Sequence, residues 1–316
     1  GAATRAAPAP KTTTAKTTKS APKAPPAQAA PAAQAGQQKR RPEHFTDLGN
    51  AYRLIRLYGD DLRHVTGWGW LTWDGRRWQR DDKPAYLAAK SVALGLYGDA
   101  QDLMGQAKKH LEAAQRAAEL GDARAEAIAQ DRMKELQSRA AALASWAKAS
   151  QSRGKIEAAV KLAESEPAVS ALSEDFDGDP WLLSCENGTL DLRTGELRPH
   201  ARQDLLTRLA PVAYDPAAIC PTWDAFLTHI MGGNAEMIGF LQRAVGYSLT
   251  GSVQEQCLFF PYGGGANGKS TFLKAILSML GRDYAKQAAP DLLTVGQDRH
   301  PTELADLAGV RFVASI

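Results

Sequence analysis

Nine consecutive residues have the types and the spacing that bind the phosphates of a nucleotide. They are Gly263, Gly264, Gly265, Ala266, Asn267, Gly268, Lys269, Ser270 and Thr271, and they fit the pattern Gly-x-x-x-x-Gly-Lys-Ser. The glycines let the backbone curl so that its amides point at phosphate oxygens. Lys269 would then reach the β- and γ-phosphates, and the Ser270 hydroxyl would ligate Mg²⁺. The motif predicts a site for ATP and Mg²⁺ in which Lys269 is the catalytic side chain.

The flanking segments are those that such a loop needs. Gln256 to Phe260 is a short apolar run that predicts a buried strand before the loop. Ser270 to Leu280 predicts a helix after it, with an apolar face made of Leu273, Ile276, Leu277 and Leu280. The N-terminus of that helix would add roughly half a positive charge at the phosphates. Gly281 stands where a glycine ends a helix.

Two other interpretations of the glycines remain open. One is a glycine-rich surface turn. The other is the dinucleotide-binding pattern, which Gly263, Gly265 and Gly268 also satisfy. That pattern needs an acidic residue at the end of the next strand, about 20 residues on, but residues 281–287 are polar and not typical of a strand. Because a lysine directly after the last glycine has no role there, we favour the phosphate loop.

Length and composition describe a protein with sizeable cores. The chain has 316 residues, of which 44% are hydrophobic, enough for two domains of ordinary size. No stretch approaches the ~20 apolar residues of a membrane span. Cys185, Cys220 and Cys257 lie far apart, which argues against a disulfide scaffold and a zinc site and favours a reducing compartment. The six histidines show no metal-binding spacing.

Residues 1–42 differ from the rest of the chain in charge and composition. They hold eight Lys or Arg and no Asp or Glu, whereas the other residues hold 30 basic and 35 acidic groups. With few large apolar side chains, this segment predicts a disordered linker. It could also touch DNA phosphates without sequence preference. Because the chain opens on Gly1, we expect it to begin inside a longer polypeptide or after a tag.

Residues 43–211 predict a module of helices and β-hairpins. Thr46 would cap a helix from Asp47 to Tyr58 that buries Leu48, Tyr52, Leu54 and Ile55. Asp74-Gly75 marks a hairpin within Trp68 to Trp78. Its tryptophans could form a platform on which DNA bases stack, but cross-strand packing is the interpretation we favour.

Further along this module the pattern continues with helices and turns. Residues 101–150 predict a helical hairpin that turns at Gly121-Asp122 and has a thin apolar seam, which includes Met104, Ala107, Leu111, Ala114 and Ala118. A helix would follow through Ile156, Val160 and Leu162. Trp181 to Leu192 predicts a hairpin with an Asn187-Gly188 turn, and Thr194-Gly195 turns the chain again. The acidic residues 174–179 lack calcium-loop spacing, so they favour a surface loop.

Residues 212–316 predict an incomplete nucleoside triphosphatase domain. Helices are expected over Thr222 to His229 and Ala235 to Leu249, the second with a face of Met237, Leu241, Ala244, Val245 and Ser248. The phosphate loop follows. A short helical stretch, Thr302 to Leu307, then precedes a β-rich run at residues 309–316. The fold class expected for the chain is therefore α/β and α+β.

Several segments together resemble the phage and plasmid primase–helicase family, which belongs to the superfamily-3 helicases and includes the poxvirus primase-helicase. The resemblance lies in residues 240–251 before the strand 257–260, in the loop 265–271, and upstream in Trp181-Leu182-Leu183, residues 187–197, residues 59–63 and residues 73–78. It covers residues 43–316.

This resemblance implies an AAA+-like motor that forms a homo-oligomeric ring, a hexamer, on DNA and couples ATP hydrolysis to unwinding. It also implies a primase domain or partner upstream, no membrane, and a place in the cytoplasm of a bacterial or phage-infected cell. In this family an acidic residue follows the strand that matches Val310 to Ser315, and the chain ends before it, so we expect no turnover by the chain alone. A noncatalytic DNA-loading or primase-docking module with a vestigial phosphate loop is the competing class. A phosphate-loop transferase would need an acceptor site, which the sequence does not show.

Overall fold

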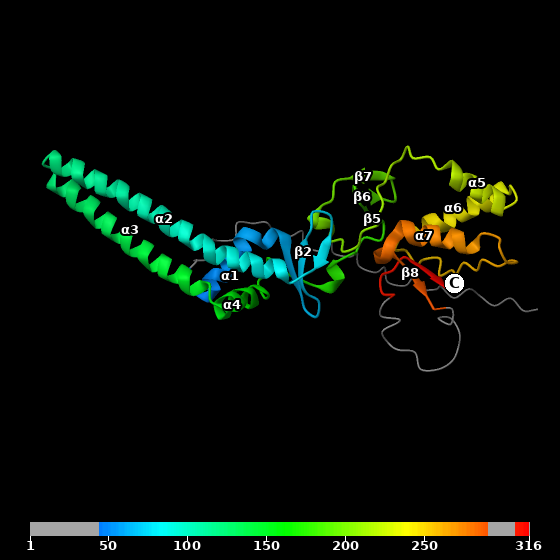
Figure 1. Cartoon of the computed structure of the whole chain (residues 1–316), viewed down its shortest axis with the longest axis horizontal. Coiled ribbons are helices and arrows are strands. Elements are labelled where there is room, and N and C mark those ends of the chain that lie inside the picture. The colour runs from blue at the N-terminus through cyan, green and yellow to red at the C-terminus, as the bar shows by residue number, and fades with distance from the viewer. Residues whose placement is uncertain (1–43, 290–306, 316) are drawn as a thin grey trace, which may run out of the picture. The chain divides into compact units, whose positions relative to one another are not determined.

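The computed structural model describes residues 44–289 and 307–315. Pro42–Ile316 form one compact unit, within which the elements are labelled as in Figure 1. The helices are α1 Asp47–Tyr58, α2 Lys83–Glu119, α3 Ala123–Ser150, α4 Arg153–Ala163, α5 Pro221–Ile230, α6 Ala235–Leu249 and α7 Lys269–Tyr284. The strands are β1 Leu62–Val65, β2 Gly69–Trp73, β3 Trp78–Arg80, β4 Ser170–Ala171, β5 Leu182–Cys185, β6 Gly188–Asp191, β7 Glu196–Arg198, β8 Ala285–Ala288 and β9 Phe312–Ser315.

Helix α1 begins and ends where the sequence predicts, but it buries a different face. The Thr46 hydroxyl accepts a hydrogen bond from the Gly49 amide at 3.0 Å, which caps the helix. Ala51 and Leu54 are fully buried against α2 and α4, whereas Leu48 is exposed. The predicted core position of Leu48 is therefore wrong. The face turns because the small Ala51 lets α4 approach closely.

The tryptophan-rich hairpin forms the expected β2–β3 pair. Trp73 lies opposite Trp78, and the Asp74 carboxylate accepts hydrogen bonds from the amides of Arg76 and Arg77, both at 2.8 Å. Strand β1 extends this sheet, and β4 adds to β1 in parallel, which gives the order β3-β2-β1-β4. Trp78 is buried with Phe176, so the predicted cross-strand packing of the tryptophans is confirmed.

Helices α2 and α3 form the predicted helical hairpin, and they run alongside each other in Figure 1. Helix α2 begins at Lys83, earlier than expected, with Pro84 in its first turn. An alanine-rich seam closes the hairpin, with Ala107, Ala114, Ala117, Ala129, Leu136, Ala140, Leu143 and Ala147 buried. Three predicted seam residues of α2 are instead exposed, namely Met104, Leu111 and Ala118. The α2 side of the seam is made by Leu96, Ala100, Ala107 and Ala114 instead.

The second hairpin packs as an antiparallel sheet in the order β5-β6-β7. Cys185 pairs with Gly188, so the turn residues are Glu186 and Asn187 and the predicted Asn187-Gly188 turn is displaced by one residue. The reason is a close approach. A Cβ atom at Gly188 would lie 2.5 Å from the carbonyl oxygen of Arg198, so the glycine serves the strand contact and not the turn.

The last part of the chain confirms the helices and corrects the strands. Helices α5 and α6 match their predicted ranges, although no α6 side chain is fully buried. Residues 281–287 were predicted not to form a strand, but strand β8 begins at Ala285 and pairs in parallel with β9. The β-rich run is thus confirmed at β9. The helical stretch predicted from Thr302 lies outside the described residues, apart from Leu307.

The buried strand predicted over Gln256 to Phe260 is wrong for the described structure. These residues form no strand, and Leu258, Phe259 and Phe260 are exposed. The predicted strand needed a neighbour to satisfy its backbone amides and carbonyls. Among the described residues, β8 and β9 pair only with each other, and the segment pairs with neither of them.

The observed class is a mixed one with helices and small sheets, as the α+β expectation proposed. A core cluster joins β5 and β6 to α7, so it includes residues on both sides of the predicted boundary at 211–212. None of the helices that the structure describes has the length and apolar character needed to cross a membrane.

Candidate nucleotide-binding site

Helix α5 fixes the point at which α7 begins. Trp223 stacks on Phe272 of α7 with ring centres 5.7 Å apart and 14° between the planes. Gly268 caps α7 in a left-handed conformation, with φ of 84°, and a Cβ atom there would lie 2.6 Å from the Cγ2 methyl of Ile230. Gly268 is therefore required for both its backbone angle and its lack of a side chain.

The predicted loop closes around the ammonium group of Lys269. Its Nζ donates hydrogen bonds to the carbonyl oxygens of Gly263 and Gly264 at 3.0 and 3.1 Å, and to Oδ1 of Asn267 at 2.7 Å. Gly263 and Ala266 take positive φ values of 148° and 57°, which give the loop its bend. The structure thus brings four of the nine predicted site residues into direct contact.

The backbone amides of the same loop keep their donors available. Within the described part of the chain, the amides of residues 263–271 donate no hydrogen bond. Asn267 is exposed and Lys269 is half-buried, and Ser270 and Thr271 lie exposed on the first turn of α7. The unbroken part of α7, from Lys269 to Leu280, begins at this point, so its unpaired amides and its dipole face the same region. These donors suit an anionic oxygen ligand.

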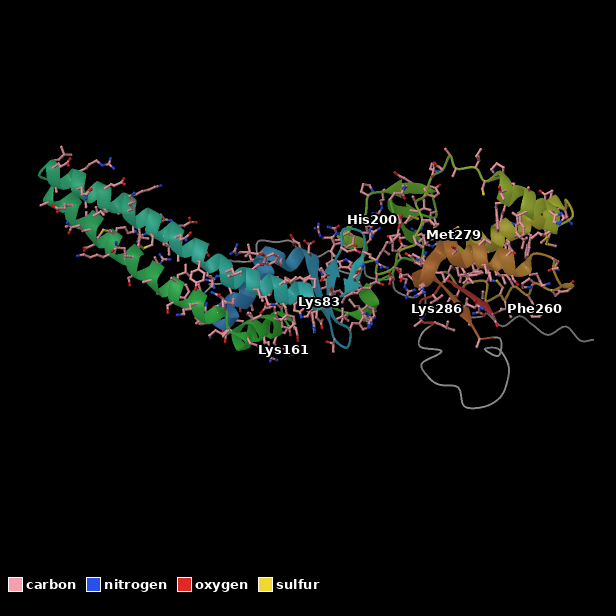
Figure 2. The ribbon with its side chains drawn as sticks, in the orientation of Figure 1. Lys83, Lys161, His200, Phe260, Met279 and Lys286 are labelled. Carbon is pink, nitrogen blue, oxygen red and sulfur yellow. The ribbon has the colours of Figure 1, made fainter. Side chains whose placement is uncertain are left out.

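The segment that leads into the loop is open to solvent. Val253, Leu258, Phe260 and Tyr262 are all exposed, and Phe260 is labelled in Figure 2. Phe259 contacts Phe240 of α6 edge to face, with ring centres 6.2 Å apart. The loop is therefore held mainly from its C-terminal side, by α7 and α5.

The far end of α7 is anchored to the hairpin module. Tyr284 is buried, its hydroxyl accepts a hydrogen bond from the Ser184 amide at 3.1 Å, and burial raises its pKa to about 12. Asp283 forms an ion pair with Arg77 of the β2–β3 turn and accepts a hydrogen bond from the Leu209 amide at 3.1 Å. The helix that starts at the loop therefore ends in fixed contacts.

Arg311 joins the strands to this anchor. Its guanidinium donates to the carbonyl oxygens of Leu249 and Leu182, both at 2.7 Å, and lies 4.8 Å above the Tyr284 ring. Desolvation by burial lowers the pKa of Arg311. The roles of Arg311, Asp283 and Tyr284 were not predicted from the sequence. Their side-chain hydrogen-bond partners lie 62 to 206 residues away, and the only local signal was an arginine beside an apolar β run.

Metal ligands do not gather elsewhere in the described residues. No group of three or more His, Cys, Asp or Glu that could hold an ion occurs there. In the acidic stretch, Asp177 instead accepts hydrogen bonds from the amide and hydroxyl of Thr207, and Asp179 pairs with Arg193. These carboxylates hold the loop in place.

The comparison with family models identifies the class of protein. The model described as D5 N terminal like matches residues 51–232, more than half of the chain. The chain therefore belongs to this family, the N-terminal domain of D5-like primase–helicases, which places it among DNA replication proteins. The match ends in the connection between α5 and α6, before the phosphate loop. No curated protein matches the chain.

Proposed function

We propose that this chain is part of a replicative primase–helicase that binds ATP with Mg²⁺ at residues 263–271 and couples ATP hydrolysis to DNA unwinding in the whole protein. The observation that carries the proposal is the bent loop at the start of α7. There Lys269 lies within hydrogen-bonding distance of three loop oxygens, while the loop amides have no acceptor in the described chain. Membership in the D5 N-terminal-like family supports the replication role.

Each side chain has a chemical task in this proposal. The loop amides donate to the phosphate oxygens, and Lys269 exchanges its carbonyl contacts for the β- and γ-phosphates. The Ser270 hydroxyl, exposed on the first turn of α7, is the ligand for Mg²⁺. When bound, Mg²⁺ neutralises charge on the triphosphate. Asn267 and Thr271 contact phosphate or sugar. Assembly into a hexameric ring on DNA, with a primase domain or protein nearby, completes the proposed activity.

Calorimetry with ATP and Mg²⁺ tests the site with a matched pair of variants. Lys269→Ala removes the ammonium group from the loop, whereas Lys274→Ala removes an exposed ammonium group five residues further along the same helix. We expect Lys269→Ala to weaken binding at least about a hundredfold, because it loses charge-assisted bonds to two phosphates. Lys274→Ala should bind as the unaltered chain does. Equal affinity in both variants would mean that the loop is not the site.

A second candidate function rests on the β2–β3 hairpin. Arg80 lies 3.9 Å above the half-buried Trp68, and neither Arg80 nor the exposed Arg76 has a carboxylate partner in the described residues. This arrangement favours a noncatalytic module that loads or docks on DNA, because arginine and tryptophan together suit stacked bases and phosphates. A salt-dependent titration with single-stranded DNA, with and without residues 1–42, tests it. Binding lost in Arg76→Gln/Arg80→Gln supports this surface, whereas unchanged binding excludes it.

A further inference from the structure

Helix α2 carries an exposed apolar stripe outside the seam that it forms with α3. Leu87 and Leu94 are 59% and 58% exposed, and Tyr97, Met104 and Leu111 are between 36% and 48% exposed. The buried seam with α3 is made instead by other residues of α2, such as Leu96, Ala100 and Ala107. The exposed side chains of the stripe therefore take no part in the contact between α2 and α3.

The spacing of this stripe is that of a coiled-coil seam. Leu87, Leu94, Gln101, Lys108 and Gln115 repeat every seven residues, and so do Lys90, Tyr97, Met104, Leu111 and Ala118. All ten are exposed on a continuous helix. Six of the ten are apolar, and the other four are Lys90, Gln101, Lys108 and Gln115. Helix α2 therefore has two heptad seams, of which α3 covers one.

Two glycines beside the stripe support a partner. Gly98 and Gly105 lie in the interior of α2, where glycine destabilises a helix by ~1 kcal/mol relative to alanine. A Cβ atom at either position would meet nothing within 4 Å. No contact within the chain explains these two glycines or Gly95, which lies off the stripe; close approach of another helix would account for the two beside the stripe.

We infer that the stripe is a self-association surface at which α2 of one chain packs antiparallel on α2 of a second copy. The stripe is self-complementary in that direction. One register places Leu94 opposite Leu111, Gln101 opposite Met104, and Leu87 opposite Ala118. The same register places Gly98 opposite Gly105 at the flank. Because the contact is two-fold, every pair occurs twice.

The charged residues of the stripe agree with this register. Lys108 faces Tyr97, where its stem packs on the ring and its ammonium group lies near the ring face. Lys90 faces Gln115, and Ser91 faces Glu112, so no layer brings two like charges together. A parallel arrangement would place Lys90 against Lys90 and Lys108 against Lys108, which is unfavourable. The polar layers fix the register and keep the affinity moderate.

This contact closes on itself and joins two chains, so it is independent of nucleotide binding and of a ring. Its primary test is sedimentation equilibrium of the 316-residue chain without nucleotide, over a series of concentrations. We expect a reversible dimer. Leu94→Lys should weaken it about a hundredfold, because the substituted layer occurs twice. Met104→Lys should act in the same direction, and circular dichroism verifies that both variants are folded.

Ile128→Lys is the matched control, since Ile128 is a similarly exposed apolar residue on α3 and lies off the stripe. Its dimer should be unchanged. A chain that stays monomeric up to ~100 µM overturns the proposal, because a specific contact of moderate affinity forms dimers at such concentrations. A dimer that persists in both stripe variants overturns it as well.

Disulfide formation tests the register itself. In a chain whose exposed Cys220 and Cys257 are replaced by serine, Gly98→Cys and Gly105→Cys are prepared separately. A mixture should give the mixed disulfide, while each variant alone should not cross-link, because like positions then lie roughly 10 Å apart at ~1.5 Å per residue. Cross-linking of Gly98→Cys with itself would indicate parallel helices and would contradict the inference.

Discussion

Replacing Gly281 by alanine should strongly destabilise the end of α7. Gly281 has φ of 64° and ψ of −176°, a combination that interrupts the helical geometry between Leu280 and Arg282. This region of backbone conformation is almost confined to glycine, and a residue with a side chain is strained there by ~1–3 kcal/mol. The interruption turns the chain from α7 into β8.

The added Cβ atom would also have no room. It would lie 2.5 and 2.8 Å from Cδ and Cγ of the Pro211 ring, which is rigid and cannot rotate away. Forcing such a contact costs a further ~1–3 kcal/mol. We therefore expect Gly281→Ala to lower the free energy of unfolding by about 4 kcal/mol. Loss of this turn would also disturb Asp283 and Tyr284, the two anchors of α7.

Urea denaturation followed by circular dichroism and tryptophan fluorescence measures the effect. Gly95→Ala is the matched control, since Gly95 lies inside α2 off the exposed stripe and a Cβ atom there meets nothing within 4 Å. That variant should be more stable by ~0.5–1 kcal/mol, because alanine favours the helix. The two identical substitutions should thus have opposite signs. A Gly281→Ala chain within about 0.5 kcal/mol of the unaltered one would refute the steric reasoning.

Of three further predictions, two concern buried polar side chains and one concerns a contact between strands. Burial lowers the pKa of His200, whose Nε2 has no hydrogen-bond partner in the described residues. Its contribution to stability is therefore full above the unfolded pKa of ~6.5 and falls as the pH drops below that value. His200→Asn should make the melting temperature depend less on pH between pH 7.5 and 5, whereas replacing the exposed His229 by Asn should leave that dependence unchanged. Because burial raises the pKa of Tyr284 to about 12, the free energy of unfolding should decline as the pH rises from ~10 to that value. Tyr284→Phe should remove this decline. At neutral pH the same variant should lose ~1–2 kcal/mol of stability, because the Ser184 amide is left without its acceptor. Gly188→Ala should destabilise the β5–β6–β7 sheet by ~1–3 kcal/mol in the same urea assay, because its Cβ atom would meet the Arg198 carbonyl oxygen; an unchanged midpoint would contradict the close approach.

Local patterns in the sequence predicted most of the elements because each has a local cause. Thr46 caps α1 with its own hydroxyl, and Asp74 closes the β2–β3 turn through two neighbouring amides. Such signals need no knowledge of the rest of the fold. The loop at residues 263–268 and the start of α7 were also visible, because glycine spacing and the amphipathic helix occur within one short segment.

Features that depend on distant partners escaped the sequence. The face of α1 is chosen by α4, about one hundred residues away, which buries Leu54 and leaves Leu48 exposed. Arg311 reads as an ordinary charged residue until its carbonyl partners on β5 and α6 are seen. The run from Gln256 to Phe260 has strand composition but no paired edge in the described structure, so propensity alone gave the wrong result.

Hydrogen exchange at the loop amides tests the central claim most directly. The account predicts that ATP with Mg²⁺ slows exchange of the amides of residues 263–271, because these donors then bind phosphate oxygens. The same ligand should leave the Lys269→Ala chain unchanged. Exchange in this segment that is identical with and without ATP and Mg²⁺, at concentrations that saturate binding in calorimetry, would show that the triphosphate lies elsewhere.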